Sequence, residues 1–380
     1  MKMHYLDNSA TTCVYQDSAK VAYDIMTKNY GNPSSLHKMG YDASLVLDNA
    51  REVIAKSVGA EPKEIYFTSG GSEADNQAIL SAAAIGKRQG KMHIISTAFE
   101  HHAVLHTLKK LEKEGFEITL LDVGEKGIVS PVQVEKAIRP DTILVTVMYA
   151  NNEIGTIQPI REIGAICRKN GVLFHTDAVQ AAGHLQINVE KDQIDMLSLS
   201  AHKFNGPKGI GVLYAKTGVF LTNLIEGGGQ ERGKRAGTEN LPAIVGMVAA
   251  LEESCSLQKE RSIYVTKLRD QLIDGLKKIP GALLNGDATN RLPGNVNFCF
   301  PDTEAEGLLL LLDNKGICAS SGSACTSGFL DPSHVLLAIG RDPQTARGSL
   351  RLTLDYENTP EEVETIIEAV TDTVRILRGC

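Results

Sequence analysis

A lysine and an aspartate in this chain each follow an apolar run, where a side chain can enter a cleft. Lys203 stands after the strand-like run 195–199 and before a loop rich in glycine and proline (SLSAHKFNGPKGIG, residues 198–211), and Asp177 ends another such run (VLFHTDAVQ, residues 172–180). Alone, the lysine fits a solvated turn equally well. With the acid it predicts a pyridoxal phosphate site, because a desolvated amine has a lowered pKa and can hold the aldehyde, while a carboxylate keeps the ring nitrogen protonated.

A second candidate site is the turn Ser69–Ser72, which joins the short strand 65–68 to a helix beginning near Glu73. Glycines, a hydroxyl and a helix N-terminus together suit a phosphate, because backbone N–H groups and the helix dipole favour an anion. An ordinary strand-to-helix turn with Ser72 as the N-cap explains the same residues, and taken alone it is the simpler interpretation.

The third candidate is Cys325, which lies in the small-residue segment SSGSACTSG, residues 320–328. No apolar neighbour is there to bury the thiol, so we expect it to be exposed, ionisable and able to act as a nucleophile. A tolerated surface cysteine is the alternative, but exposed free thiols are a chemical liability. The chain has seven cysteines and no Cys-x-x-Cys pair, which predicts reduced thiols in the cytoplasm and no metal site.

Alternating strands and helices must position these groups. Apolar runs predict strands at residues 65–68, 92–96, 116–121, 142–148, 172–175, 196–199 and 211–214. Helical patterns at 101–114 and 159–169 separate some of them, so we expect an α/β fold with a mostly parallel sheet covered on both faces. Ligands of such sheets bind at the carboxyl ends of the strands. The polar residues at or just after these ends are His101, Asn152, Asp177, Gln180 and Lys203.

Length and charge limit the remaining possibilities. A chain of 380 residues exceeds one ordinary core, so we expect a large domain at 14–257 and a smaller α+β domain formed by 1–13 and 258–380. A net charge of −7 without a basic block argues against nucleic acid and anionic membranes. The N-terminus has no apolar signal core. The glycine-rich segment Gly227–Glu239 suits either a flexible surface loop or a lid or subunit contact.

Eight motifs, in order from residue 5, resemble the group I (NifS/IscS-like) cysteine desulfurases of the class V aminotransferases. They are YLDNSATT (5–12), GNPSS (31–35), FTSGGSEADN (67–76), EHHAV (100–104), NNEIG (151–155), HTDAVQ (175–180), SAHK (200–203) and SSGSACTSG (320–328). The resemblance implies the type I fold of pyridoxal-phosphate-dependent transferases. It also implies a cytoplasmic homodimer that takes sulfur from L-cysteine and passes it to an iron–sulfur scaffold or another acceptor protein.

The resemblance also implies a role for individual residues. Lys203 would bind pyridoxal 5'-phosphate covalently, Asp177 would pair with the ring nitrogen, Gln180 would reach the phenolic oxygen, and His101 would stack on the ring and shuttle protons. The phosphate would be held by Gly71, Ser72, Ser200 and His202, and by Thr238 of the neighbouring subunit. Asn152 and Arg351 would bind the substrate carboxylate, since an arginine fork suits that group. Cys325 would take the sulfur as a persulfide, leaving L-alanine.

Other interpretations remain open on sequence grounds. A selenocysteine lyase or a small-substrate aminotransferase would use the same cofactor, although a transaminase would not need the Cys325 segment. A non-catalytic sulfur-relay or scaffold protein is a third possibility, against which the presence of Lys203, Asp177 and His101 together argues. Housekeeping members extend beyond the position of Cys380, so a nitrogen-fixation-type or specialised member is as plausible as a housekeeping one.

Overall fold

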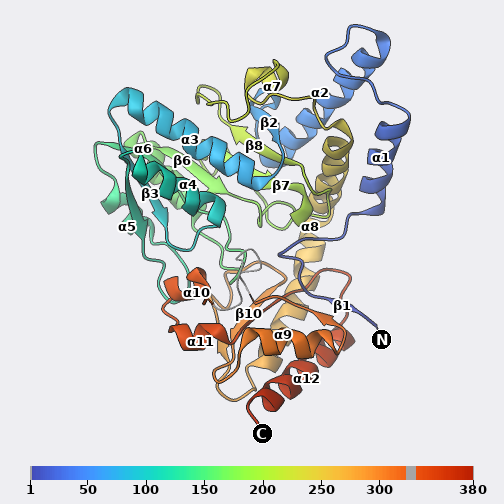
Figure 1. Ribbon diagram of the computed structural model, residues 1–380, viewed down its shortest axis with the longest axis vertical. Helices are drawn as coiled ribbons and strands as arrows, with labels where there is room; N and C mark the ends of the chain where they lie inside the picture. Colours follow the sequence, from blue (N-terminus) through green and yellow to red (C-terminus); the bar gives the residue numbers. More distant parts are fainter. Residues whose placement is uncertain (1, 322–330, 380) are drawn as a thin grey trace.

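The molecule consists of a larger upper part and a smaller lower part. Its structure is a computed structural model, which describes residues 2–321 and 331–379. A seven-stranded sheet forms the centre of the upper part and a three-stranded sheet that of the lower part (Figure 1). Both labelled chain ends lie beside the lower part in Figure 1, so the chain starts there, builds the upper part and returns.

The large sheet has the strand order β2-β8-β7-β6-β5-β3-β4. Among these described strands β8 alone runs in the direction opposite to the others, so the predicted α/β fold with a mostly parallel sheet is confirmed. The strands are β2 (Ile65–Thr68), β3 (His93–Thr97), β4 (Glu117–Leu121), β5 (Thr142–Thr146), β6 (Leu173–Asp177), β7 (Met196–Ser200) and β8 (Gly211–Ala215).

Helices cover both faces of this sheet. Side chains of α2, α6 and the first half of α8 enter the core on one face, and those of α3 and α4 enter the core on the other. The helical elements of the upper part are α1 (Gln16–Thr27), α2 (Lys38–Val58), α3 (Gly71–Gln89), α4 (His102–Lys113), α5 (Pro131–Ala137), α6 (Ile160–Asn170) and α7 (Gln230–Gly233), with 3-10 turns at Pro62–Glu64 and Ala201–Lys203.

The double coverage explains why the strands read as continuous apolar runs. Ile94 enters the core beneath α3 and α4, whereas its neighbour Ile95 enters the opposite core. Leu144 and Val145 divide between the two cores in the same way. Since successive side chains of a strand point to opposite faces, a sheet buried on both sides needs apolar residues at consecutive positions.

The lower part has its own core and its own sheet. Its antiparallel sheet has the order β12-β10-β9, and a separate parallel pair joins the N-terminal β1 to β11. Leu6, Phe298 and Val370 belong to the core beneath it. The elements are β1 (His4–Tyr5), β9 (Leu283–Leu284), β10 (Asn295–Cys299), α9 (Ala305–Asp313), β11 (Ile317–Cys318), α10 (His334–Ala338), α11 (Pro343–Arg347), β12 (Ser349–Thr353) and α12 (Pro360–Leu377).

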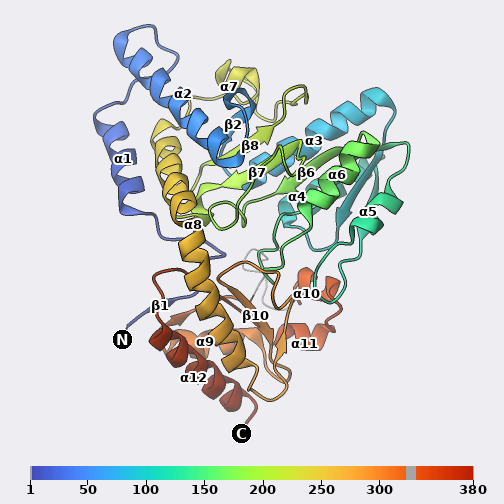
Figure 2. The same cartoon turned by 180° about the vertical axis from the view of Figure 1, so that it is seen from behind.

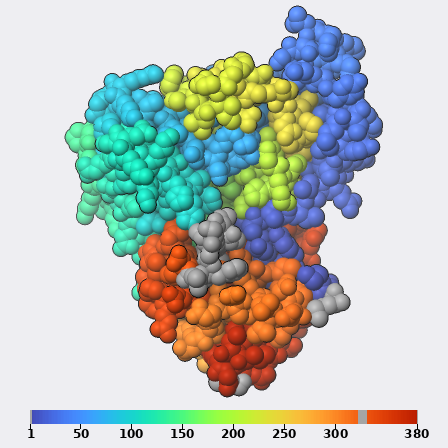
Figure 3. All heavy atoms as spheres, in the orientation of Figure 1, coloured from blue at the N-terminus to red at the C-terminus, as the bar shows by residue number. Residues whose placement is uncertain are grey.

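One long helix, α8 (Leu241–Leu276), connects the two parts, as Figure 2 shows. Its 36 residues span roughly 54 Å at the usual helical rise. Leu251 packs in the upper core and Val265 in the lower core. The predicted domain division after residue 257 falls between them and stays a prediction. Figure 3 shows N-terminal residues, in dark blue, where the two parts meet.

Among the described residues, no helix combines the length and the apolar character that crossing a membrane requires.

Candidate active site

Four predicted site residues follow the carboxyl ends of neighbouring parallel strands and line one cavity. Asp177 ends β6, Lys203 follows β7, Asn152 follows β5 and His101 follows β3. The cavity has a volume of about 300 Å³, which lies at the lower end of the range for small-molecule sites. We call it the strand-end cavity. Of the residues predicted for the site, those that line it are Gly71, Ser72, His101, Asn152, Asp177, Gln180, Ser200, His202, Lys203 and Arg351.

Asp177 presents a buried carboxylate to this cavity. Its Oδ1 accepts a hydrogen bond from the backbone N–H of Val179 at 2.9 Å. Burial raises the pKa of Asp177 to about 6, against the opposing effects of that N–H and of the Lys203 charge. A carboxylate held this way can bind a protonated ring nitrogen, because a nearby cation repays the cost of burying its charge.

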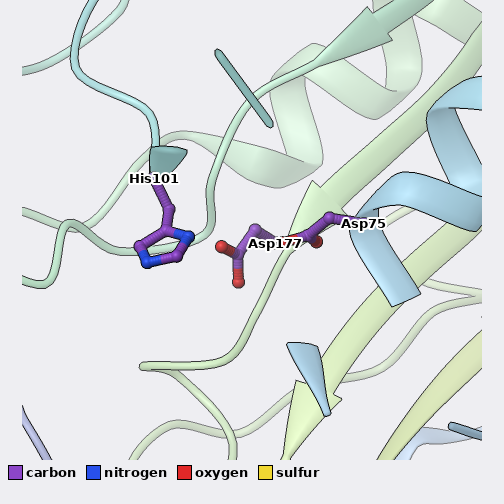
Figure 4. Close-up of side chains that lie close together, drawn as sticks. All are labelled: Asp75, His101 and Asp177. Carbon is purple, nitrogen blue, oxygen red and sulfur yellow. The ribbon is translucent and has the colours of Figure 1, made fainter. Parts of the chain in front are cut away.

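His101 faces Asp177 and stays neutral at ordinary pH. Its Nδ1 accepts a hydrogen bond from the backbone N–H of Ala103 at 3.1 Å, so the neutral ring carries its proton on Nε2. Burial, followed by the charge of Lys203, lowers the pKa of His101 to about 4. Asp75, His101 and Asp177 each offer one atom within 4.8 Å of the others. Figure 4 shows Asp177 between the other two side chains.

The turn before α3 forms an anion cradle in the wall of the cavity. Gly70, the N-cap, has φ 154° and ψ −177°, a conformation open almost only to glycine. A Cβ on Gly71 would lie 2.6 Å from the Val179 side chain, so glycine is required there too. The first N–H groups of α3 have no helical acceptor. With the hydroxyls of Ser72 and Ser200 beside them in the cavity lining, they suit a phosphate.

The N-terminal segment closes the cavity around Lys203. The Nζ of Lys203 donates hydrogen bonds to the backbone carbonyls of Ser9 and Ala10, the latter at 2.7 Å. Gln180 Nε2 donates to the Ser9 carbonyl at 2.9 Å. The Nδ1 of His202 lies 3.3 Å from the Thr11 hydroxyl. Sequence reasoning found the motif at 5–12 but assigned no site residue to it, because its contribution comes largely from backbone carbonyls.

Arg351 enters the cavity from β12 of the lower part. Its Nη2 donates to Asp7 Oδ1 at 2.8 Å, and its Nη1 donates to the backbone carbonyl of Asn152 at 3.2 Å. The two residues predicted to bind the substrate carboxylate are therefore in contact. Asp7, which sequence reasoning did not assign to the site, holds the guanidinium in a fixed orientation. Because residues of both parts line the cavity, it lies at their junction.

Comparison with known proteins identifies the family. A family model described as aminotransferase class-V matches residues 4–366. The chain belongs to the class-V aminotransferases, and within them to the cysteine desulfurases. A cysteine desulfurase IscS of Methanosarcina thermophila is 52% identical over 378 residues, which cover 100% of this chain and 93% of the relative. The putative cysteine desulfurase IscS 1 of Bacillus subtilis is 47% identical over 379 residues, 99% of this chain and 100% of the relative.

Two solved structures with similar folds agree with this membership. A NifS-like protein superposes with a TM-score of 0.92 at 38% identity, covering 99% of this chain and all of the other. SspA in complex with cysteine gives a TM-score of 0.80 at 37% identity, covering 93% of this chain and 99% of the other. The predicted family and fold class are confirmed, as is dependence on pyridoxal phosphate, which class-V aminotransferases share.

The cavity of this cysteine desulfurase family member fits pyridoxal phosphate by the chemistry of its donors and acceptors. Its lining offers a lysine amine, a buried acid for the ring nitrogen and a helix N-terminus for a phosphate. Oδ1 of Asp75 is buried without a hydrogen-bond partner among the described residues, so the cavity wall holds an acceptor that this chain leaves unused. The roles predicted for individual residues stay predictions.

One predicted site residue lies elsewhere, and another is outside the described residues. Thr238 is exposed and does not line the strand-end cavity of its own chain. Cys325 lies in 322–330, outside the described residues. Conversely, Asp75, Glu153 and His334 line the cavity but were not predicted. The first two lie inside motifs already noted, at 67–76 and 151–155, so their acidic character was the available signal; His334 carries no motif.

Proposed function

We propose that this protein converts L-cysteine to L-alanine and retains the sulfur as a persulfide on Cys325, from which an acceptor protein takes it. The observation that carries the proposal is the meeting of Lys203, Asp177 and Arg351 in one cavity, since these provide an amine, a ring-nitrogen partner and a carboxylate receptor. The names of the similar proteins support the same activity. None of them favours a selenocysteine lyase or an aminotransferase.

Each residue of this chain would contribute one physical step. Pyridoxal phosphate, when bound, supplies a ring that withdraws electrons from the substrate Cα. Arg351 and Asn152 would orient the substrate carboxylate, and the amine of Lys203 would take the Cα proton. Asp177 would hold a proton at the ring nitrogen and Gln180 would reach the phenolic oxygen. Gly71, Ser72, Ser200 and His202 would bind the phosphate.

His101 would act as a proton shuttle and as a stacking surface. Because its pKa is lowered to about 4 by burial and by the Lys203 charge, the ring is neutral near pH 7 and has the Nε2 proton to donate. Its Nδ1 is committed to the Ala103 N–H, so Nε2 is the nitrogen that exchanges protons. The thiolate of Cys325 would attack the substrate sulfur, breaking the Cβ–S bond while a proton replaces sulfur on Cβ.

A homodimer would complete each site with Thr238 of the neighbouring subunit. The segment Gly227–Glu239 is anchored by two ion pairs, between Arg51 and Glu231 at 2.8 Å and between Arg235 and Glu73 at 2.9 Å. These bonds favour a fixed contact surface over a flexible loop. Apolar side chains stay exposed on the projecting helices α1 and α2 (Figure 1), which supports burial against a second copy; they are Tyr23, Met26, Tyr41 and Leu45.

We further propose that the protein works in the cytoplasm and supplies sulfur for iron–sulfur cluster assembly or for other acceptors. The cysteines that the structure describes, Cys13, Cys167, Cys255, Cys299 and Cys318, all have free thiols, as expected in a reducing compartment. The net charge of −7 argues against nucleic acid as a partner.

The test is incubation of the loaded protein with L-cysteine and a reductant, with alanine and sulfide measured together. Equal amounts of both are expected. Cys325→Ser should keep the cofactor colour and bind cysteine, but release little alanine and show no sulfur adduct by mass spectrometry. Cysteine consumption without sulfide would contradict the proposal, as would undiminished alanine from the serine variant. A sulfur adduct on a peptide that lacks position 325 would identify a different nucleophile.

A further inference from the structure

Two buried acids, Asp75 and Asp177, lie at the same end of the strand-end cavity. Asp75 comes from α3 and Asp177 from the end of β6, and carboxyl oxygens of the two lie within 4.8 Å. Asp75 is 1% exposed and Asp177 is 6% exposed. At this separation and burial, two negative charges repel strongly, so the pair in an unloaded cavity keeps one proton.

The partners of the two acids decide where the proton resides. Asp177 accepts the Val179 N–H at 2.9 Å and lies near the positive charge of Lys203. Oδ1 of Asp75 has no hydrogen-bond partner among the described residues, and the nearest basic atom, Nε2 of His175, is 3.6 Å away. Burial, followed by the charge of Asp177, raises the pKa of Asp75 well above its usual range, against the opposing effect of a hydrogen bond from the Ser198 side chain. Asp177 is therefore the ionised member and Asp75 the protonated one.

The other groups around Asp75 do not neutralise it. His175 is buried, and burial lowers its pKa to about 3, so its ring carries no charge. Glu100 is a further acid near Asp75, and burial raises its pKa to about 8, so near pH 7 it is mostly protonated and supplies no positive charge to balance Asp75. The titratable or charged groups that face the pair are His175 and Glu100, with His101 and Lys203 on the cavity side of Asp177.

We infer that Asp75 is a positioning residue for the ring nitrogen, which shares one proton with Asp177 in the unloaded cavity and gives that proton up when the cofactor binds. The inference rests on the proposed place of Asp177 beside that nitrogen. Only an O–H bond breaks, and the proton goes to solvent. The pair changes from one negative charge to two, next to the positive charge of the protonated ring nitrogen. The second carboxylate thereby strengthens the field that keeps the ring nitrogen protonated.

Substitution by asparagine separates this role from simple packing. Asp75→Asn keeps the size and a polar oxygen but removes the proton that the pair can release. Its matched control is Asp192→Asn, which changes an aspartate that is also buried but lies outside the strand-end cavity, 3.2 Å from Arg161 Nε. A purely structural role predicts that both variants behave like the wild type in proton exchange.

The experiment is calorimetric titration of pyridoxal phosphate into the cofactor-free protein near pH 7, in two buffers with different ionisation enthalpies. We expect the wild type and Asp192→Asn to release about one proton per site more than Asp75→Asn. By linkage, each pH unit should raise the association constant of the wild type by a further factor of about ten compared with that of Asp75→Asn. Equal proton counts and equal slopes would overturn the inference.

Infrared difference spectroscopy on the wild type makes the test independent of the variant's folding. With aspartate carboxyls labelled by carbon-13, loading should remove one protonated aspartate band per site; an unchanged band would overturn the inference. A protein that shows this loss but makes no alanine from cysteine would contradict the proposed function alone. Failure to bind pyridoxal phosphate would contradict both.

Discussion

Two buried clusters of ionisable side chains in the upper part differ in how their charges are paired. Nη1 and Nη2 of the Arg51 guanidinium donate to Glu231, at 2.9 and 2.8 Å, and the backbone N–H of Phe67 donates to the same carboxylate at 2.9 Å. Asp75 and Asp177 instead place two acids side by side, and Oδ1 of Asp75 has no hydrogen-bond partner among the described residues.

The difference separates an anchor from a binding site. Arg51 and Glu231 neutralise each other's charge. Their ion pair holds the backbone of Glu231 at φ 48°, a left-handed conformation that costs a non-glycine residue free energy. Removing either partner leaves a buried charge uncompensated. The two aspartates offer one more carboxyl group than the charge of Lys203 can balance, which is the condition under which a cationic ligand is attracted.

Removing Asp177 from the binding cluster should have the largest effect, which is on the rate of the reaction. Asp177→Ala removes the charge beside the ring nitrogen, so the rate of alanine formation should fall by about a thousandfold, or about 4 kcal/mol in the activation barrier. Weak cofactor binding through the anion cradle should survive. Alanine production and cofactor absorbance measure the two separately, and near-normal turnover would remove Asp177 from its proposed role.

Removing the acid of the anchor should lower stability. Glu231→Ala leaves the Arg51 guanidinium buried without its carboxylate, and such losses cost about 3–5 kcal/mol. The free energy of unfolding from urea titration checks this. A cost below about 1 kcal/mol would show that water or a neighbouring group replaces the carboxylate, and the contrast between the clusters would not hold.

The pH dependence of stability should differ between wild type and Asp177→Asn in the cofactor-free protein. Burial raises the pKa of Asp177 from 3.8 to about 6, so the unfolded chain loses this proton first and stability falls as pH rises from about 4 to about 6. The asparagine variant lacks this loss. At pH 8 it should be more stable than the wild type by about 2–3 kcal/mol, and at pH 3 the two should match. A wild-type advantage at pH 8 would contradict the prediction.

The smallest effect is expected at a partly exposed pair of the same segment. Arg235 contacts Glu73 at 2.9 Å, with side chains 24% and 10% exposed. Arg235→Gln should reduce the free energy of unfolding by no more than about 1 kcal/mol, because solvent screens the charge that is lost. Thermal unfolding of this variant and of Glu231→Ala under the same conditions compares the two losses of stability. Equal losses would show that burial does not make the Arg51–Glu231 pair more important than the Arg235–Glu73 pair.

Most of the large sheet and of the candidate site could be predicted, because both depend on local patterns. Consecutive apolar residues identified the seven strands of the sheet to within about two residues at most ends, and polar residues just beyond them identified His101, Asp177 and Lys203. Parallel strands carry these positions to one edge, so the cavity follows from the topology. Short elements such as α5 (Pro131–Ala137) and α10 (His334–Ala338) were not predicted, since few residues carry little periodicity.

Only the tertiary structure brought together groups that are distant in the chain. Arg351 meets Asp7 across 344 residues, Lys203 meets the Ser9 carbonyl across 194, and Arg51 meets Glu231 across 180. The sequence does not show which backbone carbonyl will accept a hydrogen bond, nor which opposite charge will pair with a charged residue. Residue spacing therefore predicts none of these contacts. The sequence by itself determined which chemical groups stand at the ends of the strands. Folding decided which buried acids are paired with a base and which, like Asp75 beside Asp177, are not, and burial makes that difference large because it removes the water that would otherwise screen the charges.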